Sequence, residues 1–128
     1  VATACEIRPL STKTSDVFLF WLISKCIMLT IKAKKAQIPG ICFACSHAAF
    51  RKVNGFNERI HNIEDLDFSM RLNKIGDIVF TNKTAALTSM RRFERLGRTK
   101  SLALYSRMYV EYNFKKENFN SKKFIPIR

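Results

Sequence analysis

The hydrophobic residues of this chain recur with the periods of both strands and helices. Residues 1–7 alternate weakly and contain β-forming side chains, which predicts a strand ended by Pro9. An apolar pattern running nearly all round residues 17–31 predicts a helix, capped by Ser15 or Asp16, that is buried or lies at an interface. This apolar stretch is about 15 residues long and contains Lys25, whereas a membrane span needs roughly 20 residues, so we expect it not to cross a bilayer.

The middle of the chain predicts a short strand and two helices. Pro39-Gly40 marks a turn, and the apolar run 41–44 fits a strand. A short helix over 48–53 should stop at Asn54-Gly55, where a glycine adopts positive φ at little cost. The next helix should begin at Asn62, with Asp65 three residues later as in a capping box. Its inward face is predicted to consist of Ile63, Leu66, Met70 and Leu72.

The last third of the chain predicts two strands and a basic helix. Residues 77–81 and 85–89 contain strand-forming residues, separated by the turn residues Asn82-Lys83. Residues 98–112 have helical periodicity with a basic opposite side, and residues 115–128 are polar and basic. Strands and helices interleave along the chain, so the predicted fold class is α/β.

Composition adds a charge argument to this pattern. The chain has 128 residues, 47% of them hydrophobic and eleven of them Phe, which is enough for one domain with a core. Its formal net charge is +13, and residues 88–128 carry eleven Lys/Arg against three Glu, a net of +8. A polyanion or an anionic surface is the partner that such a charge favours.

The four cysteines favour free thiols in a reducing compartment. Their count is even, but they lack the density and loop-rich context of a disulfide scaffold. Cys42 and Cys45 form a C-x-x-C with His47 close by, so a zinc or redox site is the alternative. Cys5 and Cys26 are widely separated and do not supply a second ligand pair. This favours the interpretation that the cysteines are small, buried hydrophobic residues.

A carboxylate cluster stands out in this basic chain. Residues 55–72 hold four of the ten acidic residues, three of them at Glu64, Asp65 and Asp67. Acids in a first helical turn are favoured by the helix dipole at about 0.3 to 1 kcal/mol each. An ion pair from Asp67 to Arg71 is also expected from their i,i+4 spacing. Electrostatics alone therefore explains each residue singly, but not the motifs around them.

Several motifs occur together in a fixed order. A small-residue segment over 44–49 is followed by Gly55-Phe56-Asn57-Glu58, by Glu64-Asp65-x-Asp67 with Arg71, and then by Gly76 and a predicted strand. Further on come Thr88-Ser89-x-Arg91-Arg92 and Gly97. In this order the chain resembles the acceptor side of the family 2 glycosyltransferases over residues 40–97, close to half of its length.

The resemblance implies a fold and a boundary. Residues 1–97 would be the C-terminal, acceptor-binding half of a nucleotide-diphospho-sugar transferase (GT-A type) α/β sandwich, and residues 98–128 a basic amphipathic helix and tail. Because the chain starts at Val1, inside a predicted strand, we expect it to be a piece of a longer polypeptide. No leader pattern argues for secretion. The donor-binding half would lie upstream, so the isolated fragment is expected to be inactive.

The resemblance also assigns roles to residues. Asp65 would be the general base that takes the proton of the acceptor hydroxyl, with inversion at the anomeric carbon, and Glu64 would orient the acceptor or the base. Arg91 and Arg92 would meet the leaving diphosphate, although a solvated strand end explains this pair equally well. His61 would contact the substrate, or it is a surface imidazole. Structural support would come from Asp67, Arg71 and Gly55.

Asp65-Leu66-Asp67 is also an Asp-x-Asp, the motif with which these enzymes hold a metal. In the family that motif precedes the region matched here, so no metal is assigned to this chain. Mg or Mn is expected in the full enzyme, at an upstream Asp-x-Asp. The partners implied are a nucleotide-sugar donor and a glycan or lipid-linked acceptor. The expected location is cytoplasmic, peripheral at the inner face of the membrane. Association of copies through an uncovered sheet surface is a further expectation.

The competing hypothesis is a non-enzymatic basic module that binds an anionic membrane or nucleic acid. Lys and Arg mixed with Tyr and Phe over residues 91–123 suit such surfaces. No RNP-like aromatic strand, zinc-finger spacing or clear helix-turn-helix pattern is present, which makes nucleic acid the less favoured partner. Charge alone does not separate the membrane-binding module from a membrane-associated enzyme.

Overall fold

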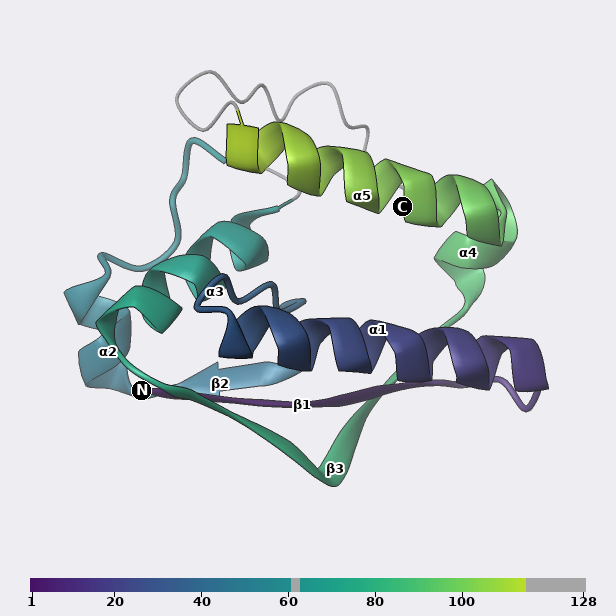
Figure 1. Cartoon of the computed structure of the whole chain (residues 1–128), viewed down its shortest axis with the longest axis horizontal. Helices are drawn as coiled ribbons and strands as arrows, with labels where there is room; N and C mark the ends of the chain where they lie inside the picture. The colour runs from purple at the N-terminus through teal and green to yellow at the C-terminus, as the bar shows by residue number, and fades with distance from the viewer. Residues whose placement is uncertain (61–62, 115–128) are drawn as a thin grey trace.

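A three-stranded mixed sheet forms one layer of the computed structural model, which describes residues 1–60 and 63–114. The central strand β1 (Ala2–Pro9) pairs antiparallel with β2 (Phe43–Cys45) and parallel with β3 (Ile78–Thr88). Helices lie on one face of this sheet (Figure 1). On the opposite face Val79 and Leu87 are exposed, and no helix of the described residues covers them. The predicted α/β class is confirmed.

Strand β3 is one strand, so the prediction of two strands over 77–81 and 85–89 is wrong. Thr81 pairs with Cys5 and Ala85 with Glu6, so residues 82–84 bulge out between consecutive rungs of the ladder. Figure 1 shows the sharp bend that results. Since β1 offers backbone partners on both sides of the bulge, Asn82 and Lys83 interrupt the ladder without ending the strand.

Helix α1 (Thr14–Lys32) packs along β1. Its inner face buries Phe20, Ile27 and Ile31 in the main core, and Ser24 Oγ accepts a hydrogen bond from the Ile7 backbone N–H at 3.1 Å. The predicted cap is wrong: the helix begins at Thr14, and its first turn has no side-chain cap.

Helices α2 (His47–Lys52) and α3 (Glu64–Ile75) complete the main core. The Ser46 hydroxyl caps α2 by accepting from Ala49 N–H at 3.2 Å. As predicted, the chain turns at Asn54-Gly55, where both residues have positive φ, 58° and 61°. Ile63 at the N-cap of α3 and Leu72 within it are buried as predicted. Leu66 and Met70 are only half-buried, and the buried Phe68 was not part of the predicted face. The predicted cap Asn62 lies outside the described residues.

Helices α4 (Arg91–Leu96) and α5 (Arg98–Phe114) form the side farthest from the sheet (Figure 1). Gly97 joins them with φ 82°, a conformation that favours glycine. Met108 and Tyr112 of α5 pack with Ile63 in a second, smaller apolar cluster. The predicted helix over 98–112 is therefore confirmed and is two residues longer at its C-terminal end.

Candidate active site

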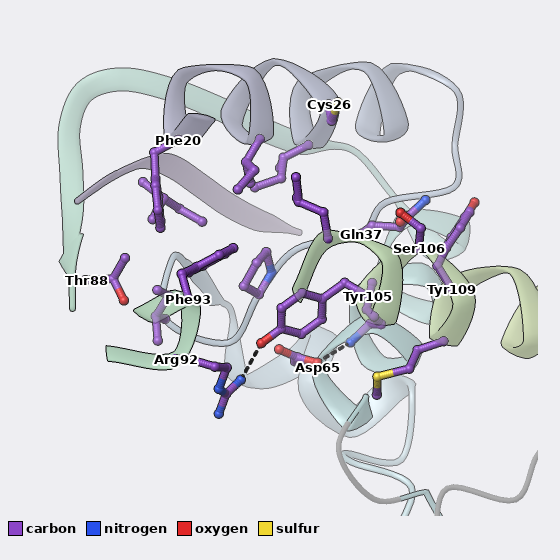
Figure 2. A pocket seen from close by; sticks show the side chains of 18 of the residues that line it. Phe20, Cys26, Gln37, Asp65, Thr88, Arg92, Phe93, Tyr105, Ser106 and Tyr109 are labelled. Atoms are coloured by element: carbon purple, nitrogen blue, oxygen red, sulfur yellow. Dashed lines mark hydrogen bonds between the residues drawn. The ribbon is translucent and has the colours of Figure 1, made fainter. Parts of the chain in front are cut away.

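A cavity of about 770 Å³ lies between α1 and α5. Its walls come from seven places in the chain: β1, α1, the segment 37–41, the start of α3, the end of β3, α4 and α5. Most of the lining is apolar, including Phe20, Ile27, Phe93 and Met108. Polar side chains interrupt this lining, and Figure 2 labels Gln37, Asp65, Thr88, Arg92, Tyr105, Ser106 and Tyr109 among them.

Asp65 is the only carboxylate on this wall among the described residues. Its Oδ2 accepts the Gly40 backbone N–H at 2.7 Å, and its Oδ1 accepts the Leu66 N–H at 2.8 Å. Burial raises the pKa of the Asp65 carboxyl above its ordinary value, and the charge of Glu64 raises it further, while the two N–H donors oppose both effects. The carboxylate is thus oriented, half-buried and of raised basicity.

The bond to Gly40 belongs to a ladder that sequence reasoning missed. Asp65, Ser69 and Asn73 lie four residues apart on α3. Each accepts a hydrogen bond from a backbone N–H of the segment 36–40, in which every second residue donates. The Ile38 N–H donates to Ser69 Oγ and the Ala36 N–H to Asn73 Oδ1, both at 3.2 Å. Four residues of helix rise about 6 Å and two residues of extended chain about 6.6 Å, so the spacings match. Asp65 therefore also has a structural role, as the first rung.

Glu64 is exposed and does not line the cavity, although its charge acts on Asp65. The predicted substrate contact His61 lies outside the described residues.

The arginine pair begins a helix, so its description as a strand end is wrong. Arg91 and Arg92 occupy the first turn of α4 and both line the cavity. Arg92 Nη1 donates to the Tyr105 hydroxyl at 2.6 Å, and Figure 2 shows this bond beside the apolar ring of Phe93. Arg95 of the same helix also lines the cavity, so three arginines and one carboxylate share it.

Asp67 and Arg71 form the ion pair that their i,i+4 spacing predicts. Arg71 Nε donates to Asp67 Oδ2 at 2.8 Å, and Arg71 Nη1 donates to the Val53 carbonyl. The Tyr112 hydroxyl of α5 donates to Asp67 Oδ1, a contact that the sequence did not suggest. Asp67 is buried, and its two carboxylate oxygens are held by Arg71 and Tyr112.

Gly55 supports the turn before the acidic helix for two reasons. Its φ of 61° disfavours any other residue. A Cβ at this position would also lie 2.9 Å from Cζ of Phe50, in a ring cluster with Phe56 and Phe68. The glycine is thus required by both backbone and packing.

Asp16, one of the two residues predicted to cap α1, has a different role. It is 2% exposed and accepts from Ser11 Oγ at 2.7 Å and from Arg98 Nε at 2.8 Å. The Ser11 hydroxyl, followed by the Arg98 guanidinium, lowers the pKa of the Asp16 carboxyl. Asp16 therefore anchors the start of α5 to α1.

All four cysteines are free thiols, and Cys42 of the C-x-x-C is buried. Burial, followed by the nearby Cys5 and Asp65, raises the pKa of the Cys42 thiol to about 12. Thiol exchange proceeds through the thiolate, so this raised pKa lowers the reactivity of Cys42. His47 is exposed at the start of α2. Within the described residues, no three His, Cys, Asp or Glu side chains are grouped as a metal site.

No protein-family model, curated protein or solved structure matches the chain.

Proposed function

We propose that the chain is the acceptor-side half of an inverting family 2 glycosyltransferase. In this proposal the parent enzyme transfers a sugar from a nucleotide-diphosphate donor to a hydroxyl acceptor, for glycan or cell-envelope synthesis. The observation that carries the proposal is Asp65: an oriented carboxylate of raised pKa on the wall of a large cavity. It is the residue that the motif resemblance selects as the base.

The proposed step is a single displacement. An acceptor hydroxyl gives its proton to the Asp65 carboxylate while its oxygen attacks the anomeric carbon. The bond from that carbon to the diphosphate oxygen breaks, and the nucleoside diphosphate leaves with the electron pair. Because the pKa of Asp65 is raised, the carboxylate is a stronger base than an exposed aspartate.

Arg91 and Arg92 suit the leaving group in this proposal. Guanidinium groups present fixed donors that match phosphate oxygens and neutralise the charge that develops on departure. Arg92 keeps one donor on Tyr105, which holds the side chain at the cavity wall. Glu64 acts through Asp65 by raising its pKa. A substrate contact for His61 stays a prediction.

The donor nucleotide and its divalent cation, Mg or Mn, belong to a half of the enzyme upstream of Val1. An Asp-x-Asp there would hold the cation and the donor diphosphate, and no step in this chain is assigned to it. The isolated chain is accordingly proposed to be inactive in transfer, and the parent enzyme to work at the cytoplasmic side of a membrane.

The non-enzymatic alternative has one observation in its favour. A net charge of +13 accompanies an exposed apolar face on α1, a combination that suits a membrane surface better than nucleic acid. Membrane contact is compatible with both hypotheses, so activity must separate them.

The test is sugar transfer by the longer polypeptide that the proposal requires. Asp65→Asn keeps an oxygen acceptor for the ladder and should abolish transfer while leaving the circular dichroism spectrum unchanged. Asp77→Asn is the matched control, since Asp77 is exposed, away from the cavity, and should retain activity. Wild-type transfer in Asp65→Asn would remove the proposed base.

A further inference from the structure

Helix α1 has two apolar faces, of which the fold uses one. The inner face carries the buried Phe20, Ile27 and Ile31. On the outer face Phe18 is 62% exposed, Trp21 47% and Leu29 59%. Large apolar side chains gathered on one exposed helix face are typical of an interaction surface.

The outer face also has a defined aromatic and charge arrangement. The rings of Phe18 and Trp21 stack with centroids 5.7 Å apart, and Lys25 Nζ lies 5.6 Å from the Trp21 ring centroid. Five lysines occur over residues 13–35, whereas the single acid there, Asp16, is buried and paired with Arg98. The exposed charges that accompany the apolar face are therefore all positive at this helix, namely Lys13, Lys25, Lys32, Lys34 and Lys35, of which Lys34 is paired with Asp77.

Length and composition alone would let α1 cross a membrane. Its inner face, however, is bound to the sheet: Ser24 is hydrogen-bonded to Ile7, and Asp16 holds Arg98. A helix fixed along a sheet cannot be surrounded by lipid, because the polar groups beside it need protein partners. The outer face alone is available, which suits a helix lying in the plane of a membrane surface.

We propose that the outer face of α1, defined by Phe18, Trp21, Lys25, Leu29 and Lys32, binds the surface of an anionic bilayer. Phe18, Trp21 and Leu29 enter the boundary between headgroups and acyl chains, where amphipathic aromatic rings are favoured. Lys25 and Lys32 lay their methylene stems along this apolar surface and place their ammonium groups at lipid phosphates. The basic charge of the chain favours anionic lipid over neutral lipid.

Trp21 makes the test direct, because it is the only tryptophan of the chain. The intact chain is mixed with phosphatidylcholine vesicles, with and without phosphatidylglycerol, and the tryptophan emission is recorded. With phosphatidylglycerol the emission should shift to shorter wavelength, and lipids brominated on the acyl chain should quench it. Emission that stays unshifted and unquenched while the protein co-sediments with the vesicles would contradict the proposal. The protein would then bind the vesicles by another basic surface.

Matched variants separate the apolar contribution from the charge. Phe18→Ser with Leu29→Ser should lower vesicle partitioning about tenfold or more, because the transfer of two large apolar side chains is lost. Leu10→Ser with Leu87→Ser removes similarly exposed apolar groups elsewhere and should leave partitioning unchanged. Equal losses in both pairs would overturn the assignment to α1.

Charge variants test the lipid preference. Lys25→Gln with Lys32→Gln should reduce the advantage of phosphatidylglycerol vesicles more than Lys52→Gln with Lys74→Gln, which alters exposed lysines on α2 and α3. A second copy of the chain on this face would shift Trp21 emission with protein concentration in the absence of vesicles, and that result would also overturn the proposal. Each readout is independent of transferase activity.

Discussion

The sheet side of the molecule and the α5 side are held by different forces. On the sheet side, one continuous core joins β1, the inner face of α1 and the ring cluster around Phe68. On the other side, α5 packs through a small cluster and is fastened near each end by a buried carboxylate, Asp16 at Arg98 and Asp67 at Tyr112. The cavity lies between these two attachments. The position of α5, which forms one wall of the candidate site, thus depends on a small cluster and a few polar contacts. The opposite wall, on the sheet side, is held by extensive apolar burial.

Phe68→Ala should produce the largest loss of stability. Phe68 is 1% exposed and contacts the rings of Phe43, Phe50 and Phe56, so its truncation should cost about 3 to 5 kcal/mol and destabilise the whole domain. Denaturant unfolding of both proteins measures this. Leu87→Ala, at an exposed strand position, is the control and should cost little. A small effect at Phe68 would mean that the ring cluster does not hold the sheet side together.

Tyr112→Phe should have a smaller and local effect. It leaves Asp67 Oδ1 without its hydroxyl donor, which should cost about 1 to 3 kcal/mol. Amide hydrogen exchange should accelerate in α5 and stay slow in β1. Tyr109→Phe, a tyrosine on the same helix, serves as the comparison and should change neither. Uniform acceleration across both regions would contradict the separate attachment of α5.

Asp16, which holds α5, and Asp65, on the cavity wall, should change the free energy of unfolding with pH in opposite directions. Asp16 has a lowered pKa in the folded state, so its stabilising contribution is present above the unfolded value of about 3.9 and is lost as pH falls through the folded pKa. The first turn of α5 should therefore loosen in acid, as NMR of the Arg98 Nε–H would show. Asp16→Asn should remove this transition.

Asp65 has the reverse linkage. Because its folded pKa is raised, its contribution to stability is full below the unfolded pKa and is lost as pH rises through the folded pKa. Comparing the free energies of unfolding of Asp65→Asn and the native chain across this pH range isolates the effect. A stability difference that grows in the opposite direction would show that the carboxylate is not desolvated.

Much of the sheet side was predictable because its determinants are local. Alternation in β1 and the turn at Gly55 with its positive φ follow from residue type and spacing. The buried face of α3 follows only in part, because Leu72 was predicted and Phe68 was not. The bulge in β3 was not, because Asn82 and Lys83 form a turn in isolation and only β1 keeps the strand continuous.

The α5 side was less predictable because its contacts join distant parts of the chain. Asp16 and Arg98 are separated by 82 residues and Asp67 and Tyr112 by 45, and no local pattern reports such pairs. At the candidate site, the motif order selected Asp65, Arg91 and Arg92, which the fold brings to one cavity. The ladder along α3 had a visible signature, polar residues at 65, 69 and 73, which sequence reasoning overlooked.

The most direct test of the catalytic claim is the pH dependence of kcat/KM for the longer transferase that the proposal requires. The acid limb of that profile reports the pKa of the essential base in the free enzyme. We expect an apparent pKa above the ordinary aspartate value of about 3.9, set by the desolvated carboxylate of Asp65. An acid limb at or below the ordinary value, or a profile without one, would contradict Asp65 as the base.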